Sequence, residues 1–173
     1  MQHDEEPRFS VDLFTDGACL PNPGPGGWAF ILKHPARSKE GSGVENPSTN
    51  NRMEIMAVIK GLEALKLPTR VALYSDSEYV VNAVNGWMEK WKRFGWSRSR
   101  NGKKPIKNVD LWRRLDELCQ RHRVTAHWVR GHAGHAENER CDFLATEAAK
   151  LATTLPTRPA MMPPEPLPPL FQT

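Results

Sequence analysis

The feature that most constrains this chain is a short apolar run, Val71 to Tyr74, with a helical pattern on each side of it. Four residues are too few for a helix, and a strand that is apolar on both faces is typical of the centre of a parallel sheet. Apolar residues at helical spacing predict a helix over residues 49–66 before this strand, and a shorter helix is expected over 78–85 after it. The alternation of strand and helix predicts an α/β domain with a crossover connection.

Weaker patterns complete the predicted element order. Alternating polar and apolar residues predict a first strand at 9–14, and a turn rich in proline and glycine separates it from a second strand at 28–32. The stretch from 34 to 48 is polar and turn-rich, with only a weak strand pattern at 41–45. The remaining expected elements are helices over 87–94, 109–121 and 136–151 and a last strand over 124–129.

The composition excludes several classes of protein, and 173 residues suffice for one domain with a buried core. Three cysteines without a Cys-x-x-Cys pair favour a reduced, cytoplasmic protein over a disulfide scaffold. No run of eighteen apolar residues is present, so no membrane span is expected. The expected boundaries are a loose leader at 1–7, a domain at 8–151 and a disordered tail at 152–173, where seven of 22 residues are proline.

Positive charge is concentrated in one segment. Residues 87–107 carry eight basic side chains and one acidic one, which leaves 16 basic and 19 acidic residues in the rest of the chain. A local basic patch that also carries tryptophans suggests contact with nucleic acid, although a solvated charge run is the commoner meaning of such clusters. We interpret this segment as an excursion from the domain.

Four acidic residues are expected near the ends of elements. They are Asp16 after the first strand, Glu54 early in the first long helix, Asp76 after the central strand and Asp142 early in the last helix. Each has an ordinary explanation when taken alone. Asp16 could cap its own turn, Glu54 could stabilise the helix dipole, and Ser75 or Asp76 could cap the helix that follows.

A shared role follows if the first strand and the central strand are parallel neighbours, because Asp16 and Asp76 would then lie side by side. Like charges so close raise each other's pKa, and a hard divalent cation removes that penalty. Oxygen ligands select Mg²⁺ or Mn²⁺ over zinc. Two such ions about 3.5–4 Å apart can hold the attacking and leaving oxygens of a phosphodiester in line.

A zinc site is the alternative interpretation of this region. The residue types that could bind zinc are His127, His132, His135 and Cys141. Their spacing matches no common zinc pattern. A loop histidine near carboxylates is better interpreted as a proton carrier, because its pKa lies near neutrality.

Four motifs together resemble the bacterial ribonuclease HI family. In chain order they are Thr15-Asp16-Gly17-Ala18 with Pro21-Asn22-Pro23-Gly24, Thr49 to Glu54, Tyr74-Ser75-Asp76-Ser77, and Gly131 to His135 with Asn138 to Asp142. Their order and spacing match the family from about residue 8 to 151. Four motifs in register are far more specific than any one of them.

The resemblance implies a ribonuclease H-like fold, with a five-stranded mixed sheet of strand order 3-2-1-4-5, strands 1 to 3 antiparallel, and flanking helices. The basic excursion at about residues 87–107 would be the basic handle of the family. It implies an endonuclease that hydrolyses the RNA strand of RNA–DNA hybrids and leaves 5′-phosphate and 3′-hydroxyl ends. Two Mg²⁺ ions, or Mn²⁺ as a substitute, would be bound by Asp16, Glu54, Asp76 and Asp142. His132 would assist proton transfer or product release, and the enzyme would be a monomer without an obligate protein partner.

The resemblance also implies contacts with the hybrid. The expected contacts are Asn22, Asn50 and Asn51 in the minor groove, Thr49 and Asn108 on a DNA-strand phosphate, and Trp87, Lys90, Trp91, Lys92 and Arg93 in the handle. The asparagines would read the RNA 2′-hydroxyls, which distinguish RNA from DNA. Pro47 departs from the pattern, because some relatives have a phosphate-binding arginine there.

Two other functions stay open at this level. A DNA nuclease or integrase-like enzyme could use the same fold, but a DNA substrate offers no 2′-hydroxyl to the three asparagines. A non-catalytic nucleic-acid-binding protein would account for residues 87–107. It would leave unexplained why four acids lie close to a polyanion that they repel without a metal.

Overall fold

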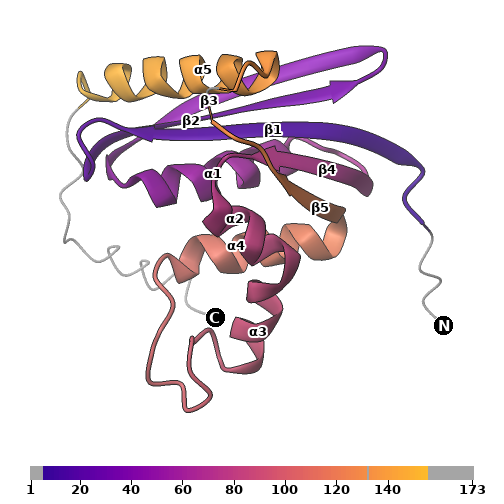
Figure 1. Cartoon of the computed structure of the whole chain (residues 1–173), viewed down its shortest axis with the longest axis vertical. Coiled ribbons are helices and arrows are strands. Elements are labelled where there is room, and N and C mark those ends of the chain that lie inside the picture. Colours follow the sequence, from indigo (N-terminus) through magenta and orange to yellow (C-terminus); the bar gives the residue numbers. More distant parts are fainter. Residues whose placement is uncertain (1–5, 132, 156–173) are drawn as a thin grey trace, which may run out of the picture.

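The computed structural model describes residues 6–131 and 133–155 and has three layers (Figure 1). The strands are β1 (Phe9–Cys19), β2 (Gly24–His34), β3 (Arg37–Ser48), β4 (Thr69–Ser75) and β5 (Arg123–Trp128). The helices are α1 (Asn50–Glu63), α2 (Glu78–Asn82), the π-helical turn η1 (Ala83–Trp87), α3 (Met88–Arg93), α4 (Val109–Arg121) and α5 (Ala136–Ala152). Helix α5 covers one face of the sheet, and α1 and α4 cover the other. Within the described residues, no helix is long and apolar enough to span a membrane.

The five strands form one mixed sheet in the order β3-β2-β1-β4-β5. Strand β2 is antiparallel to both β1 and β3, whereas β4 lies between β1 and β5 and is parallel to both. The predicted topology is therefore confirmed, including the central parallel position of the apolar run. The parallel pairing of β1 with β4 ends at Phe14 opposite Tyr74, so the residues after this pair lie beyond the parallel part of the sheet.

The first hairpin is longer than its sequence suggested. Strand β1 continues through Asp16 to Cys19 because its antiparallel pairing with β2 extends to the pair Cys19 and Gly26. The prediction that the first strand ends before Asp16 is therefore wrong. Of the glycines assigned to the turn, Gly17 belongs to β1, and Gly24, Gly26 and Gly27 belong to β2. Gly27 packs so closely on α5 that a Cβ atom there would clash with the helix backbone. Small residues mark a close helix contact here.

The polar stretch after β2 is also a strand over most of its length. Strand β3 pairs with β2 from Arg37 opposite His34 to Ser48 opposite Gly24, and not only over the predicted 41–45. As an edge strand it has one neighbour, and many of its side chains are exposed, so it carries little apolar periodicity. The hairpin register supplies the order that the sequence pattern lacks.

The helices follow the prediction more closely. Helix α4 has the predicted bounds, and α1 begins after Thr49, whose Oγ1 accepts a hydrogen bond from the amide of Arg52 at 3.2 Å. Ser77, rather than Ser75 or Asp76, caps α2. The two short helices predicted over 78–85 and 87–94 form one continuous helical segment, joined by η1.

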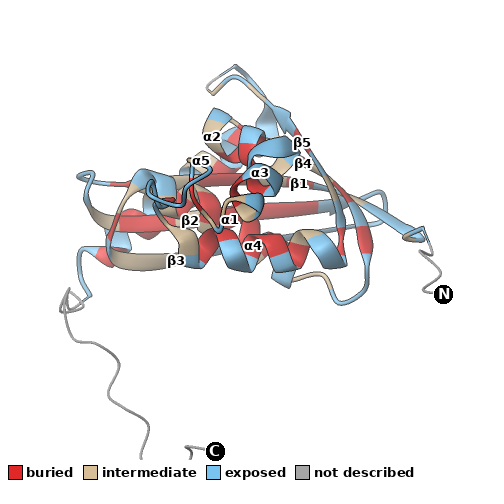
Figure 2. Ribbon diagram, turned by 90° about the horizontal axis from the view of Figure 1, so that it is seen from below, coloured by how far each residue is buried: buried red, intermediate tan, exposed pale blue. Residues whose placement is uncertain are grey.

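The core lies between the sheet and the α1/α4 layer (Figure 2). Its largest fully buried side chains include Trp112, Leu13, Ile55 and Leu73. The segment from η1 through α3 and the following loop projects away from this core (Figure 1). At the other end of the chain, Glu6 forms ion pairs with Arg70 and Arg123. Residues 1–5 and 156–173, which hold most of the expected leader and tail, lie outside the described residues.

Candidate active site

Three of the four predicted acids converge at one point. Carboxylate oxygens of Asp16, Glu54 and Asp76 all lie within 4.8 Å of one another. Asp16 lies two residues beyond the last parallel pair of β1 and β4, and Asp76 directly follows β4. The end of the parallel pairing thus brings two acids together that are 60 positions apart in the sequence.

Glu54 reaches the same point from the second turn of α1. Gly17 makes this approach possible, because a Cβ atom there would lie 2.5 Å from the backbone of Met53 and Glu54. The Gly17 amide also donates a hydrogen bond of 2.9 Å to Oδ1 of its neighbour Asp16. The Asp-Gly pair therefore supplies one carboxylate and the space for the second.

The electrostatics of the cluster are unfavourable without a cation. Burial, together with the negative charge of Asp76, raises the pKa of Asp16 to about 7. Burial and the charge of Asp16 also raise the pKa of Glu54 well above its usual range. Near neutral pH the protein alone holds at least part of this cluster in the protonated form.

The donor set fits a bound divalent cation. Oε2 of Glu54 is shielded from solvent and has no hydrogen-bond partner among the described residues. A buried oxygen without a partner is costly unless a ligand satisfies it. The ligand atoms are carboxylate oxygens, which suit hard ions such as Mg²⁺, Ca²⁺ and Mn²⁺. The cluster therefore has the composition, charge and unsatisfied oxygen of a metal site.

Asp142 lies beside this group of ligand atoms but is not part of it. It is half-buried in the second turn of α5, and its charge contributes to the raised pKa of Asp16. His132 lies outside the described residues. Its neighbour Gly131 is close to the cluster, since a Cβ atom there would lie 2.9 Å from Oδ2 of Asp76.

The described zinc candidates do not converge on a common point. The His127 ring is stacked on Tyr74 with 5.2 Å between ring centroids, and the Cys141 thiol donates to the carbonyl oxygen of Phe14 at 3.4 Å. Burial and the charge of Asp16 raise the pKa of Cys141, which keeps the thiol protonated. His135 is exposed at the start of α5. The described geometry thus favours the carboxylate cluster over zinc.

Trp128 is a contact that the sequence did not single out. Its indole Nε1 donates a hydrogen bond of 3.1 Å to the backbone carbonyl of Asp76, and the Val129 amide donates to the carbonyl of Ser75 at 2.9 Å. These bonds hold the chain just where it leaves β4. The position of Trp128 at the end of the last strand was visible in the sequence, but its partner was not.

Two of the predicted groove asparagines are held together. The amide of Asn50 donates to Oδ1 of Asn22 at 3.2 Å, and both side chains are exposed, as is Asn51 beside them. The buried Cys19 thiol lies 3.2 Å from the carbonyl oxygens of Pro21 and Gly24, and it also contacts Ser48 at 3.4 Å. The loop after β1 is therefore fixed against the start of α1, next to the carboxylate cluster.

Arg52 connects the two residues predicted to bind a phosphate. The Arg52 amide donates a hydrogen bond to Oγ1 of Thr49, and the Arg52 Nη1 donates one of 3.3 Å to Oδ1 of Asn108. Its guanidinium is also shared between Glu45 and Asp110. Arg52 therefore orients Asn108 and brings no net positive charge. No sequence pattern singled out Arg52, although it lies inside the motif from Thr49 to Glu54.

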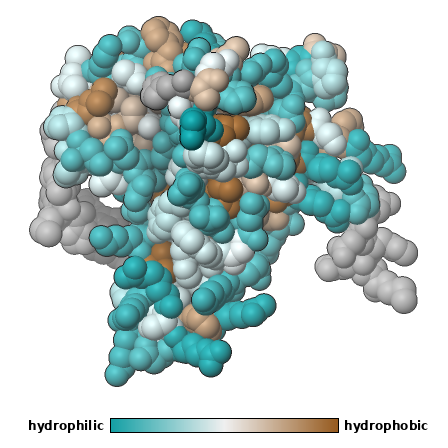
Figure 3. Space-filling model, viewed as in Figure 1, coloured by the Kyte–Doolittle hydropathy of each residue, from teal (hydrophilic) through white to brown (hydrophobic). Residues whose placement is uncertain are grey.

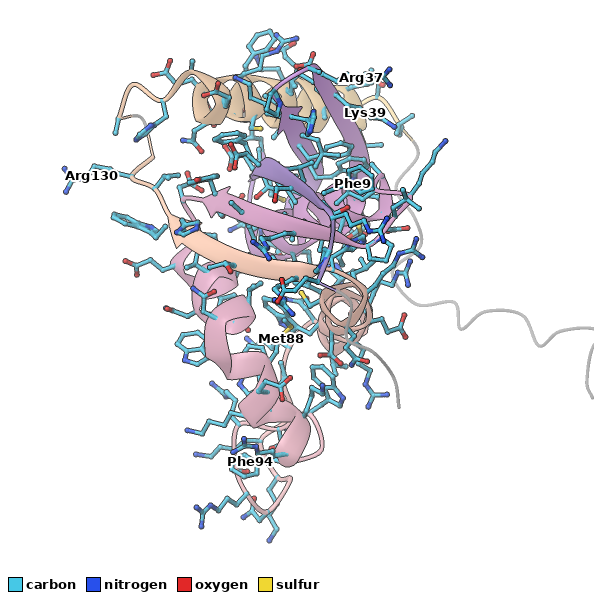
Figure 4. All side chains as sticks on the ribbon, turned by 90° about the vertical axis from the view of Figure 1, so that its right-hand side faces the viewer. Phe9, Arg37, Lys39, Met88, Phe94 and Arg130 are labelled. Atoms are coloured by element: carbon cyan, nitrogen blue, oxygen red, sulfur yellow. The ribbon has the colours of Figure 1, made fainter. Side chains whose placement is uncertain are left out.

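The handle residues fall into two groups. Trp87 is 43% exposed, and Lys90 and Arg93 line a basic pocket together with Phe94. The projecting handle has a mainly hydrophilic surface (Figure 3), and Phe94 lies near its end (Figure 4). Trp91, by contrast, is only 6% exposed.

Two predicted contact residues are thus committed to the protein itself. Trp91 packs on Tyr79, Trp87 and Trp112 with centroid distances of 6.2, 6.1 and 5.4 Å. The Lys92 ammonium lies 3.1 Å from Oδ1 of Asp116, on α4. These contacts fix the root of the handle on α4.

The fold and the site define an α/β class of protein in which acids gather at the end of parallel strands, in a group with the oxygen atoms that a divalent cation prefers. A sequence model described as RNase H matches residues 8–150. The chain is 56% identical to ribonuclease H of Rhodospirillum rubrum over 142 residues, which cover 82% of this chain and 84% of the relative. It is 58% identical to ribonuclease H of Rhodopirellula baltica, covering 80% and 89%. The chain belongs to the ribonuclease H family and is a nuclease.

Solved structures agree with this assignment. LC9-RNase H1, described as a type 1 RNase H with the type 2 active-site motif, superposes with a TM-score of 0.75 and 31% identity over 86% of this chain and 76% of that chain. LC11-RNase H1, solved in complex with an RNA/DNA hybrid, has a TM-score of 0.60 and 20% identity over 83% of this chain and 99% of that chain, and it shares the fold.

Proposed function

We propose that this chain hydrolyses the RNA strand of RNA–DNA hybrids and leaves 5′-phosphate and 3′-hydroxyl ends. The observation that carries the proposal is the convergence of Asp16, Glu54 and Asp76 around an unsatisfied buried oxygen, beside the exposed pair Asn22 and Asn50. The cluster supplies a site for phosphodiester hydrolysis. The asparagines supply amide groups that can bond to RNA 2′-hydroxyls, which DNA lacks.

Four acids are proposed to hold the metal. Asp16, Glu54 and Asp76 are the residues we expect to bind two Mg²⁺ ions, with Mn²⁺ as a substitute, and Asp142 would complete the set from α5. Bound ions would lower the pKa of a water molecule and stabilise charge on the phosphate. His132 is proposed to carry a proton or to assist product release.

The remaining surface is proposed to bind the DNA strand. Thr49 and Asn108 would bond to one phosphate, with Asn108 oriented by Arg52. On the handle, Trp87, Lys90 and Arg93 are exposed to a neighbouring duplex, whereas Trp91 and Lys92 support the handle from within. Together these contacts would place the RNA strand over the carboxylates.

The three converging carboxylates all come from one chain, which supports a monomer as the working form. All three cysteines are free, and Cys19 and Cys141 are buried, which agrees with a reducing compartment such as the cytoplasm. We therefore propose a monomeric enzyme that needs no protein partner for hydrolysis.

A strand-specific cleavage assay tests the function. Hybrids labelled at the end of either strand are incubated with the protein, with Mg²⁺ or with chelator. We expect cleavage of the RNA strand only, dependence on Mg²⁺, and no cleavage by Asp76→Asn. Single-stranded RNA and duplex DNA of the same sequence serve as matched substrates.

The outcomes separate the competing functions. Cleavage of the duplex DNA would favour a DNA nuclease of the same fold. Tight hybrid binding without cleavage at any metal concentration would indicate a binding protein. Full activity with chelator, or in Asp76→Asn, would overturn the metal mechanism.

A further inference from the structure

Asn85, at the root of the handle, bonds to the edge of the sheet with both ends of its side-chain amide. Its Oδ1 accepts a hydrogen bond of 3.0 Å from the amide of Ala126, and its Nδ2 donates one of 2.9 Å to the carbonyl of the same residue. Asn85 lies in η1, and Ala126 lies in β5. The two residues are 41 positions apart in the sequence.

This pairing satisfies the backbone groups of one residue on the outer edge of the sheet. Strand β5 is the last strand beyond β4, so its outward amide and carbonyl groups have no further strand to bond. The side-chain amide of Asn85 takes the place of a peptide group from a sixth strand. Among side chains of this length, only asparagine offers a donor and an acceptor in this arrangement.

The π-helical turn η1 sets the direction of the handle. Such turns are rare and occur often at functional sites. The extra residue in the turn changes the direction of the helix that follows. One inserted residue rotates the next helix by about 100° relative to an uninterrupted α-helix. Here the turn joins α2, which starts just after Asp76, to α3, which carries Lys90 and Arg93. The bond from Asn85 to β5 fixes this turn from the sheet side.

The other contacts of the handle root go elsewhere. Tyr79, Trp87, Trp91 and Trp112 pack together, and Lys92 pairs with Asp116, so these groups connect the handle to α4. Asn85 connects it to β5, two residues before Trp128. Trp128 in turn donates to the carbonyl of Asp76. The handle is thus linked to the carboxylate cluster through the bonds of Asn85 to Ala126, the end of β5 and the bond of Trp128 to Asp76.

We propose that Asn85 is a positioning residue that sets the distance and angle between the basic handle and the carboxylate cluster. The proposal rests on the proposed function, since the handle must bind one part of a hybrid while the cluster acts on another. It makes Asn85 a determinant of affinity for hybrids that reach the handle. It leaves the chemical step at the carboxylates unchanged.

The test compares Asn85→Ala and Asn85→Asp with the control Asn82→Ala, an exposed asparagine in the preceding α2. Asp keeps the shape and the acceptor but loses the donor. Each variant is assayed on a long hybrid that spans the site and the handle and on a short hybrid that ends before the handle. Amide hydrogen exchange at Ala126 is measured without substrate.

We expect KM for the long hybrid to rise about fivefold in both Asn85 variants, which corresponds to about 1 kcal/mol for the lost bonding. The kcat value and the kinetics on the short hybrid should stay as in the wild type. Exchange at Ala126 should become faster in Asn85→Ala, which removes the acceptor of the Ala126 amide, and should stay slow in Asn85→Asp, which keeps that acceptor, and in the control.

Three results would overturn the proposal. They are an unchanged KM in Asn85→Ala despite faster exchange at Ala126, an equal loss on both hybrids, and unchanged exchange at Ala126 in Asn85→Ala. The second result would indicate a merely structural role. If the wild type cleaves no hybrid, the proposed function fails, while the exchange measurement still decides whether Asn85 holds the edge of β5.

Discussion

The carboxylate cluster determines how single residues respond to pH. Asp16 and Glu54 hold protons in the folded, metal-free protein at pH values where the unfolded chain has lost them. Because their pKa values are higher in the folded state than in the unfolded chain, the free energy of unfolding falls as the pH rises. For Asp16 the fall begins near the ordinary pKa of 3.8 and is complete above the folded-state pKa of about 7.

Removal of one carboxylate should therefore stabilise the metal-free protein while it abolishes activity. For Asp16→Asn we expect a gain in the free energy of unfolding on the order of 2 kcal/mol at pH 8 with chelator, and a much smaller gain at pH 4. Thermal or urea unfolding at both pH values measures this. Lower stability of the variant at pH 8 would show that Asp16 is not repelled by its neighbours.

Trp128 acts on the cluster through the backbone. Trp128→Phe keeps an aromatic ring but removes the hydrogen bond to the Asp76 carbonyl. We expect the Mg²⁺ concentration for half-maximal cleavage to rise about threefold to tenfold, since groups that orient metal ligands commonly change metal affinity. A Mg²⁺ titration measures it, with Thr125→Val as an exposed control on the same strand. An unchanged midpoint would assign the indole to packing alone.

At the scale of elements, the glycines differ in how closely another element packs against them. Gly27 of β2 lies against the backbone of α5 at Ala145 and Ala149, whereas a Cβ atom at Gly86 would meet nothing within 4 Å. The same substitution should thus have opposite effects at these two sites.

We expect Gly27→Ala to destabilise the protein by more than about 2 kcal/mol, because α5 would have to shift on the sheet. Gly86→Ala should stabilise it by about 0.5–1 kcal/mol, because alanine favours a helical backbone and restricts the unfolded chain. Urea unfolding of both variants tests the pair. Equal effects would contradict the packing described for Gly27.

At the scale of the whole molecule, the basic handle projects from a mildly acidic body. Charge on a projecting element acts on substrate through released counterions, so it should be visible in the salt dependence of binding. The structure divides the predicted cations into two kinds, since Lys92 is paired with Asp116 while Lys90 and Arg93 line the open pocket.

Replacement of Lys90 and Arg93 by alanine should reduce the slope of log affinity against log salt by about 2. Lys92→Ala should change that slope less and lower stability instead, because Asp116 loses its partner. Fluorescence anisotropy of a labelled hybrid over a range of salt concentrations measures the slope for both variants, and urea unfolding measures the stability of Lys92→Ala. Equal slopes for the two kinds of variant would contradict the division.

The end of α5 sets where the domain can be shortened. Ala152 is fully buried, and its carbonyl accepts a hydrogen bond of 3.1 Å from Nδ2 of Asn46. A chain that ends at Leu155 should keep its activity and its melting temperature within about 2 °C, whereas one that ends at Leu151 should melt several degrees lower. Thermal unfolding and the hybrid assay compare them. A large loss in the longer chain would show that residues 156–173 support the domain.

The sequence by itself determined the order of elements, the central parallel strand and the motifs of the site. These features are local. The apolar run of β4 is visible because one of its faces is buried and the other, at Ala72 and Tyr74, is half-buried. The bounds of α4 are visible because one face of the helix is buried. Edge strand β3 has neither signal, so its extent came from pairing with β2.

Only the tertiary structure decided which groups meet. Asp16 and Asp76 converge because β1 and β4 are parallel, Glu54 joins them because Gly17 lacks a side chain, and Asn85 meets Ala126 across a π-helical turn. Sequence spacing predicted the acidic group only on the condition that the two strands are parallel, and it did not indicate the partner of Asn85. The free energy that selects such partners comes from burial and hydrogen bonding in the folded chain.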